Sequence, residues 1–118
     1  MIKIYHNNRC QKSRLGVKFL EKNKLDFEII NYINDPLNMD EIKFLLKKLK
    51  IKPIELIRKN ELIWKTNYKN KKLSDEEIVM AMVDNPKLIE RPIIVNEGKA
   101  IIGRPTEKIS EVVQGDNI

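Results

Sequence analysis

The chain has 118 residues, a formal net charge of +6 at pH 7, one cysteine and one histidine, and we expect a single domain over residues 1–118. A lone cysteine excludes an internal disulfide and a zinc site of the paired-cysteine type, and one histidine cannot assemble a metal site, so no metal is expected. The lysines alternate with acidic and aliphatic residues, which favours solvated helix faces and argues against a nucleic-acid partner.

The N-terminal part of the chain predicts a strand, a helix and a second strand. Isoleucines alternate with other residues over 1–5, and apolar residues also alternate over 27–32, so both segments are typical of strands. Between them, residues 11–23 have the spacing of a helix, in which Gly16 permits close packing. The side chains expected on one side of this helix are Leu15, Phe19 and Leu20. Together the three elements predict a βαβ unit with parallel strands and a right-handed crossover.

The middle of the chain predicts a helical insertion over about 38–89. Asn38 and Ser74 each stand three residues before a glutamate, which is the spacing of a capping box, and Pro53 can open a further short helix that runs to Arg58. The residues expected to pack inside the insertion are Ile42, Leu45, Leu46, Leu49, Trp64, Ile78 and Met82. The intervening segment 60–72 is polar and basic, and no element is predicted for it.

Two strands and a helix complete the prediction. Residues 92–96 and 100–102 flank Glu97-Gly98, a hairpin signal, and Thr106 opens a last helix before the chain frays from Gln114. The residues expected on the inner side of that helix are Ile109, Val112 and Val113. A βαβ half and a ββα half resemble the thioredoxin-like arrangement. The expected fold class is therefore α/β, a four-stranded mixed sheet with the helical insertion between the halves.

Cys10 lies where the first strand gives way to the first helix. A cysteine is nucleophilic as the thiolate, and a helix N-terminus with cationic neighbours lowers the thiol pKa from about 8.5 to roughly 3.5–7.5. The cationic neighbours are Arg9, Lys12 and Arg14, and His6 lies four residues upstream. We therefore expect a partly exposed thiolate. The alternative is a buried, inert cysteine that behaves as a small apolar residue.

The same cysteine bears on compartment and partners. The chain has no apolar N-terminal signal region and no apolar run of about 18 residues, so we expect neither secretion nor a membrane partner. An unpaired, accessible thiol is typical of a reducing compartment, and a cytoplasmic location is expected. Because Ser13 occupies the position three residues after Cys10, any redox reaction of Cys10 requires a resolving thiol from another molecule.

Three arginines, Arg58, Arg91 and Arg104, stand near the ends of predicted elements, and the last two each precede a proline. A residue before proline is held extended, so these two side chains should leave the chain at an end of the sheet. A guanidinium donates paired hydrogen bonds to a tetrahedral oxyanion and never loses its charge, so three of them near a thiolate would form an anion site. The alternative is a surface ion pair for each arginine, with the partners Glu55, Glu90 and Glu107.

Four motifs together resemble the glutaredoxin-dependent arsenate reductase family. They are YHNNRCQKSR at 5–14, IRKN at 57–60, ERPIIV at 90–95 and IGRP at 102–105. Their order and spacing match that family over residues 1 to about 113, and they are specific as a set although each alone is weak. Asn8 stands where the first motif of that family usually has proline.

The resemblance implies a site and a set of partners. Cys10 would attack arsenate, the triad Arg58, Arg91 and Arg104 would hold the oxyanion, and His6 would assist the low thiol pKa. No bound cofactor is implied. Glutathione is the implied co-substrate that attacks the adduct of Cys10 with arsenate, and glutaredoxin would then reduce the mixed intermediate and release arsenite. The expected partners are arsenate, glutathione and glutaredoxin, and we expect a monomer.

The residues leave other functions open. A related branch of the same fold comprises redox-sensing regulators that bind RNA polymerase, but those usually carry a Cys-x-x-Cys pair, and Ser13 argues against such a switch. A second alternative is a binding protein without catalysis whose basic helical insertion is the interaction surface. A third is a glutathione-linked reductase of the same fold with an unknown substrate. The Arg91-Pro92 bond resembles the cis-proline position of thioredoxin-like proteins, and the sequence does not determine its isomer.

Overall fold

The computed structural model describes residues 1–113, so the fraying expected from Gln114 lies outside the described residues. The fold divides into two compact units, Met1–Asp35 together with the chain from Arg91 onward, and Pro36–Glu90. The single domain expected from the chain length stays a prediction. Among residues 1–113, no helix is both long enough and apolar enough to cross a membrane.

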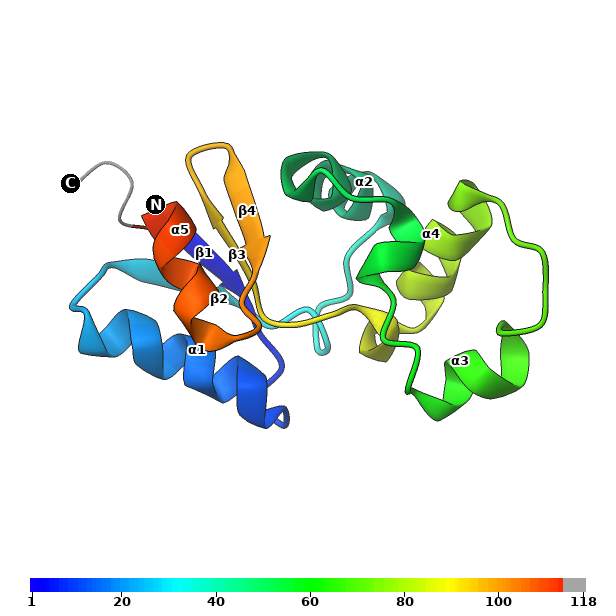
Figure 1. The fold of residues 1–118 in the computed structure, drawn as a ribbon, viewed down its shortest axis with the longest axis horizontal. Coiled ribbons are helices and arrows are strands. Elements are labelled where there is room, and N and C mark those ends of the chain that lie inside the picture. Colours follow the sequence, from blue (N-terminus) through cyan, green and yellow to red (C-terminus); the bar gives the residue numbers. More distant parts are fainter. Residues whose placement is uncertain (114–118) are drawn as a thin grey trace. The chain divides into compact units, whose positions relative to one another are not determined.

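The first unit contains a four-stranded mixed sheet (Figure 1). Its strands are β1 (Ile2–Tyr5), β2 (Phe27–Ile30), β3 (Ile93–Asn96) and β4 (Lys99–Ile102). The order across the sheet is β2-β1-β3-β4, with β1 parallel to β2 and antiparallel to β3, and β3 antiparallel to β4. This arrangement confirms the predicted α/β fold class with its βαβ and ββα halves.

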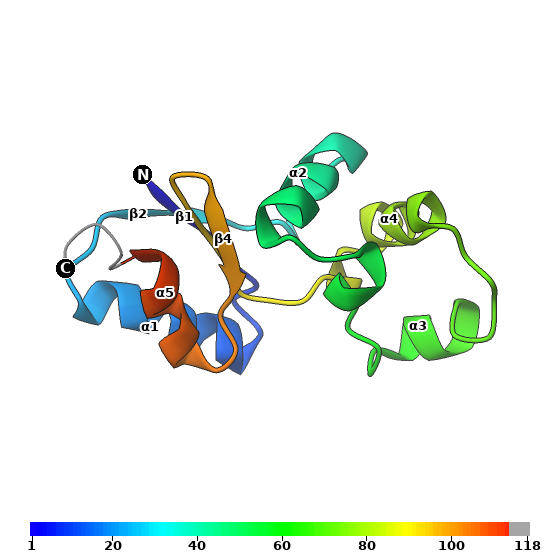
Figure 2. The ribbon, with the colours of Figure 1, turned by 45° about the horizontal axis from the view of Figure 1, so that its top comes forward.

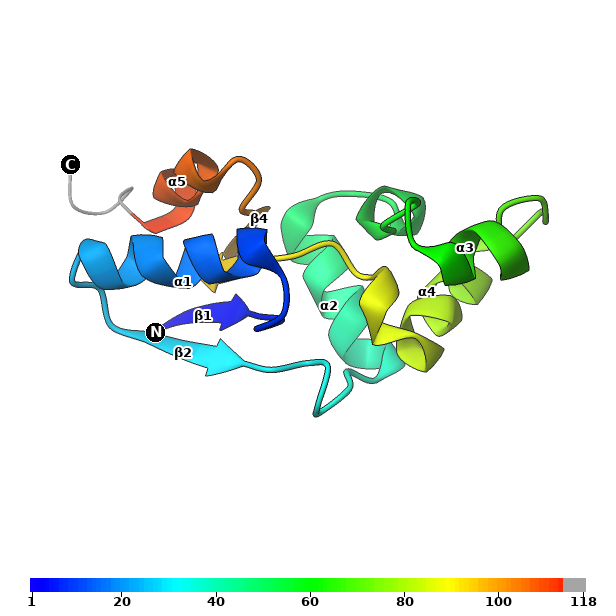
Figure 3. The same cartoon turned by 90° about the horizontal axis from the view of Figure 1, so that it is seen from below.

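Two helical segments pack on the sheet of the first unit. They are α1 (Gln11–Lys22) and a 3-10 turn (Thr106–Ile109) that continues into α5 (Ser110–Val113). Seen along the sheet in Figure 3, α1 and α5 lie on the same side of β1 and β2, and Figure 2 again shows α5 beside α1. The last helix was predicted correctly, although its first turn is a 3-10 helix.

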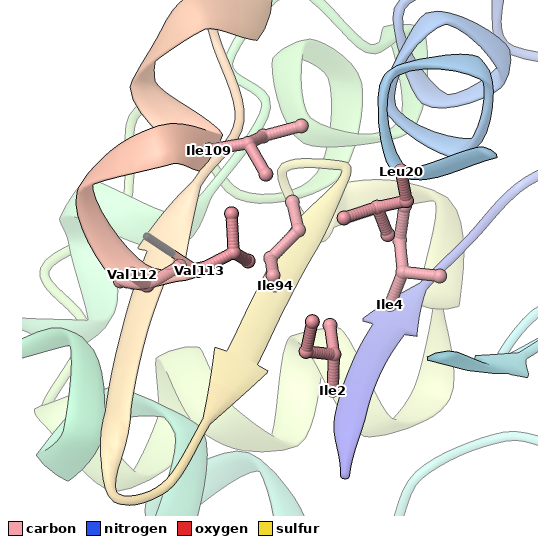
Figure 4. Close-up of a cluster of buried hydrophobic side chains, with 7 residues drawn as sticks. All are labelled: Ile2, Ile4, Leu20, Ile94, Ile109, Val112 and Val113. Carbon is pink, nitrogen blue, oxygen red and sulfur yellow. The ribbon is translucent and has the colours of Figure 1, made fainter. Parts of the chain in front are cut away.

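The core of the first unit lies between these helices and the sheet. Figure 4 shows Ile4 and Ile94 from the central strands pointing toward Leu20 of α1 and Ile109 of the 3-10 turn, and all four are fully buried. Ile2, Val112 and Val113 complete the cluster. Burying an aliphatic side chain of this size stabilises the fold by about 1.5–3 kcal/mol. The predicted inner residues Ile109, Val112 and Val113 are confirmed.

The hairpin between β3 and β4 turns at Glu97 and Gly98, as the sequence predicts. Glu97 has φ of 50° and Gly98 has φ of 82°, and Asn96 pairs with Lys99 across the turn. Two consecutive positive φ values are typical of the two-residue turn whose twist matches that of paired strands. Glycine adopts this conformation without the steric cost that a side chain adds.

The buried side of α1 differs from the prediction at Leu15, which is 36% exposed. The buried positions are instead Ser13, Gly16 and Leu20, at helical spacing of three and four, while Phe19 is half-buried. Gly16 explains which side of α1 is buried, because the absence of a side chain at this position lets the helix lie directly against the sheet. The rotation that faces Gly16 inward turns the neighbouring Leu15 toward solvent.

We expect Gly16→Ala to destabilise the protein, although alanine is the better helix former by about 1 kcal/mol. The added Cβ would lie 2.9 Å from Cγ of Pro92 and 3.2 Å from Cδ1 of Ile4. Relieving such overpacking costs about 1–3 kcal/mol, so the net loss should be on the order of 1 kcal/mol. Thermal unfolding measures it, with Lys18→Ala at an exposed position of α1 as the control. A rise in Tm for Gly16→Ala would contradict the close approach.

The second unit is helical, as predicted for about 38–89. Its helices are α2 (Met39–Leu49), α3 (Leu62–Asn67) and α4 (Asp75–Asp84), with 3-10 turns at Pro53–Leu56 and Pro86–Leu88. Both capping boxes are formed. The side chains of Asn38 and Ser74 accept the backbone N–H of the glutamate three residues on, and the carboxylate of that glutamate accepts the backbone N–H of the cap residue. These caps satisfy N–H groups that a helix start leaves without partners.

The inner residues of the second unit follow the prediction except at Leu49, which is half-buried. Ile42, Leu45, Leu46, Trp64, Ile78 and Met82 are buried. The ring of Trp64 stacks on Tyr68 with centroids 5.5 Å apart, so its role is packing. The sequence does not predict α3, because this helix is six residues long, begins without a side-chain cap and lies in a polar, basic segment. Packing of Trp64 stabilises a helix that local signals alone leave marginal.

Candidate active site

Cys10 is the N-cap residue of α1, with extended backbone angles, φ −97° and ψ 122°. Its carbonyl accepts the N–H of Arg14, which is the first hydrogen bond of the helix, and its own N–H donates to the carbonyl of Asn7. The residue is half-buried, so the thiol is accessible at the point where the helix dipole is positive. The structure therefore places Cys10 at the helix N-terminus, as the sequence predicts.

Two of the three arginines lie at this thiol. Nη2 of Arg104 donates to Sγ of Cys10 over 3.5 Å, and Nε of the same guanidinium donates to the carbonyl of Arg91 over 2.6 Å. The side chain of Arg91, which is buried, also hydrogen-bonds the thiol. Both bonds from these arginines to the following prolines are cis. The guanidinium of Arg104 thus contacts both the backbone of Arg91 and the sulfur of Cys10.

The surroundings of Cys10 act on its pKa in opposite directions. Burial raises the pKa, whereas the backbone N–H of Ser13, the hydrogen bond and charge of Arg91, and the backbone N–H of Lys12 lower it, and the net pKa is lowered. Neither N–H makes a complete capping hydrogen bond to the side chain of Cys10, so they act through their dipoles aimed at the sulfur. The thiolate is the form that this site stabilises.

His6 is buried in the loop that leads to Cys10, and its Nδ1 lies 2.7 Å from Oγ of Ser13. Burial lowers the pKa of His6, the backbone of Ser13 raises it and the charge of Arg14 lowers it, with a net lowering below 6.5. Its imidazole is therefore neutral at neutral pH and adds no positive charge beside the thiol. The structure thus favours a structural contribution of His6 over an electrostatic one.

Arg58 belongs to the second unit. The short 3-10 helix ends at Leu56, two residues earlier than the prediction, and Arg58 follows it. Its N–H donates to the carbonyl of Leu88, and its guanidinium lies 3.7 Å from Glu61 and 3.9 Å from Glu90. Both distances exceed hydrogen-bond length, and within residues 1–113 its buried Nε and Nη1 have no hydrogen-bond partner. The ion pair with Glu90 is one that the sequence offered as the alternative.

Two pockets of the second unit lie apart from the residues of the candidate site. Two pockets of about 450 and 530 Å³ border α4, and neither is lined by Cys10, His6 or any of the three arginines. Among residues 1–113, no group of three or more histidine, cysteine, aspartate or glutamate side chains could hold a metal ion. The chemistry available to this structure therefore centres on Cys10.

Ser13 enters the sequence-based prediction only as the position at which a second thiol is absent. It is fully buried, and its hydroxyl accepts the N–H of Asn7 over 3.0 Å in addition to the contact with His6. Its spacing from Gly16 and Leu20 on one side of the helix was the available signal. Serine is mostly exposed in proteins, and the pattern was therefore not interpreted as a buried position.

Comparisons with known proteins assign the chain to a family. The family model described as "ArsC family" matches residues 5–112, a range that includes every site residue proposed from the sequence. The chain belongs to the ArsC family. Its similarity to the uncharacterised protein YfgD of Escherichia coli is 45% identity over 114 residues, covering 95% of this chain and 96% of that protein. This ArsC-family chain is also 36% identical over 114 residues to a protein named arsenate reductase from Neisseria meningitidis, covering 95% and 97%.

A solved structure supports the same assignment. The structure titled arsenate reductase from Vibrio cholerae matches this ArsC-family chain with a TM-score of 0.90 and 36% identity, covering 95% of this chain and 97% of the other. The fold is therefore the thioredoxin-like fold of its ArsC-family neighbours, as the motifs of the sequence imply.

Proposed function

We propose that this protein reduces arsenate to arsenite with the thiolate of Cys10 as the nucleophile. The observation that carries the proposal is the contact between Sγ of Cys10 and the guanidinium of Arg104, with the side chain of Arg91 on the same sulfur. A nucleophile beside two permanent cations is suited to an anionic electrophile. Relatives in the ArsC family that are named arsenate reductase support arsenate as that electrophile.

The reaction follows from the chemistry of a thiolate and an oxyanion. The sulfur of Cys10 forms a bond to arsenic as an As–O bond breaks, and the oxygen leaves as hydroxide or water. This substitution leaves arsenic as As(V), so two electrons must still reach it before arsenite is released. In the net reaction, arsenate and two external thiols give arsenite, one disulfide and water. Because Cys10 is the single cysteine of the chain, the external thiols come from another molecule.

Glutathione and glutaredoxin are the thiol partners that we propose. Glutathione attacks the adduct on Cys10, and glutaredoxin reduces the mixed intermediate, which regenerates the free thiolate. The cationic neighbours Arg9, Lys12 and Arg14 are all exposed, and the first acidic residue of the chain is Glu21. This positive surface next to the thiol favours approach of an anionic thiol such as glutathione.

The arginines have distinct contributions in this proposal. Arg91 and Arg104 neutralise the charge of the bound oxyanion and of the transition state, and Arg58 supplies a third guanidinium. The guanidinium of Arg58 lies 3.7 Å from Glu61 and 3.9 Å from Glu90, so its assignment as an oxyanion ligand rests on the resemblance of its motif to the family. His6 supports the thiolate as a neutral ring and not as a cation.

A coupled assay with arsenate, glutathione, glutaredoxin, glutathione reductase and NADPH tests this proposal. We expect oxidation of NADPH that requires the protein and saturates with arsenate, because each arsenate reduced yields one disulfide for the coupling enzymes. Omission of glutaredoxin should slow the reaction. If NADPH oxidation shows no arsenate dependence while the thiol still reacts with alkylating reagents, the protein is a thiol-bearing binding or reductase domain with another partner.

A further inference from the structure

Ser13 carries a buried hydroxyl that takes no part in the proposed reaction. The side chain is fully buried on the inner side of α1, in line with Gly16 and Leu20. A hydroxyl removed from water costs free energy unless it is hydrogen-bonded, so a fully buried serine needs partners. Its two partners come from the loop on which Cys10 lies.

The hydroxyl of Ser13 has two hydrogen-bond partners in the loop that leads to Cys10. Its Oγ accepts the backbone N–H of Asn7 over 3.0 Å and lies 2.7 Å from Nδ1 of His6. We expect the hydroxyl proton of Ser13 to point to Nδ1, in which case the neutral ring carries its own proton on Nε2. One hydroxyl therefore joins the start of the loop, at His6 and Asn7, to the first turn of α1.

The same bonds extend to the nucleophile through Asn7. The carbonyl of Asn7 accepts the N–H of Cys10 over 3.0 Å, and its side-chain Oδ1 accepts the N–H of Arg9 over 3.0 Å. Holding Asn7 therefore holds the backbone of Cys10. The N–H of Ser13 itself is aimed at Sγ and lowers the thiol pKa. Ser13 thus contacts the loop at Asn7 through its hydroxyl and acts on the sulfur through its N–H.

We propose that Ser13 is the positioning residue of this site. Its hydroxyl holds the segment from His6 to Cys10, so that Sγ stays close to the N–H of Ser13 and to the guanidinium of Arg104. His6 acts on the thiol only through Ser13. This inference deepens the proposed function, since it concerns the same thiol, but it does not require that arsenate be the substrate. Its test therefore uses a reagent that reports on the thiol alone.

The pH dependence of alkylation by iodoacetamide measures the thiol pKa, because Cys10 is the single cysteine. In the wild type we expect a midpoint below about 8.5, the value of a free cysteine. Ser13→Ala should raise the midpoint by on the order of one pH unit, because Sγ loses its alignment with the N–H groups and guanidinium. Ser13→Thr retains the hydroxyl and should stay closer to the wild type. Ser110→Ala removes another serine hydroxyl bond of the same unit, to the carbonyl of Glu107, and should leave the midpoint unchanged.

A double-mutant cycle with His6→Ala separates an indirect role of His6 from a direct one. His6→Ala alone should raise the midpoint, and in the Ser13→Ala background it should add nothing. Equal shifts of the midpoint in both backgrounds would overturn the proposal, as would a Ser13→Ala midpoint identical to that of the wild type.

A second measurement uses the wild type alone and does not depend on the folding of variants. His6 is the single histidine, so its nitrogen NMR signals report the tautomer without ambiguity. We expect the proton on Nε2 and a pKa below 6.5. A proton on Nδ1 would place the hydroxyl of Ser13 in a different role and would overturn the arrangement. Failure of arsenate reduction in the coupled assay would leave both of these measurements valid.

Discussion

Cys10→Ser should abolish arsenate turnover, with a loss on the order of 10⁴-fold or more. A serine hydroxyl is similar in size to a thiol but is not ionised at neutral pH, and the chain has no other cysteine to take its place. The surrounding contacts are made mostly by backbone groups, since the N–H of Cys10 binds Asn7 and its carbonyl accepts from Arg14, so the fold should persist.

The coupled assay measures the turnover of Cys10→Ser, and thermal unfolding checks that the variant is folded. The matched control is Ser110→Ala, which changes a side chain of the same unit whose hydroxyl bonds Glu107 and should retain full turnover. Turnover near that of the wild type in Cys10→Ser would show that another group carries the reaction, and the proposed function would then be wrong.

Replacing Arg104 with lysine should reduce turnover by about 10²–10³-fold, the usual effect of removing a donor that stabilises a developing charge. Its guanidinium bonds the carbonyl of Arg91 through Nε and the sulfur of Cys10 through Nη2 at the same time. A lysine ammonium retains the charge but cannot span both partners in one plane. Arg91→Lys should have a comparable effect, because Arg91 also contacts the thiol.

The dependence of turnover on arsenate concentration measures the effect of both variants, and Arg9→Lys at an exposed position is the matched control. Arsenate, and sulfate or phosphate in its place, should raise the Tm of the wild type and raise it less in Arg104→Lys. A protein that only binds a partner through its surface would show no such anion effect. If both lysine variants turned over arsenate as fast as the wild type, the proposal that the protein is an arsenate reductase would lose its main physical support.

Much of the fold could be predicted because its signals are local. The capping boxes at Asn38 and Ser74 determine where helices start, and the turn at Glu97 and Gly98 determines a hairpin, since each depends on residues a few positions apart. The same holds for Cys10, whose place between a strand and a helix follows from the periodicity on either side. Where the local signal is weak, as in α3, the prediction failed.

The sequence by itself determined the four strands, the α-helices other than α3, their order along the chain, and Cys10 as the candidate nucleophile. Only the tertiary structure decided which side of α1 is buried, and hence that Ser13 faces inward while Leu15 is exposed. It also decided that Arg104, far along the chain, donates to Cys10, and that both Arg-Pro bonds are cis. The physical reason is that these features depend on contacts between distant segments, on the close approach of Gly16 to Pro92 and on the pairing of β1 with β3, which no local pattern encodes.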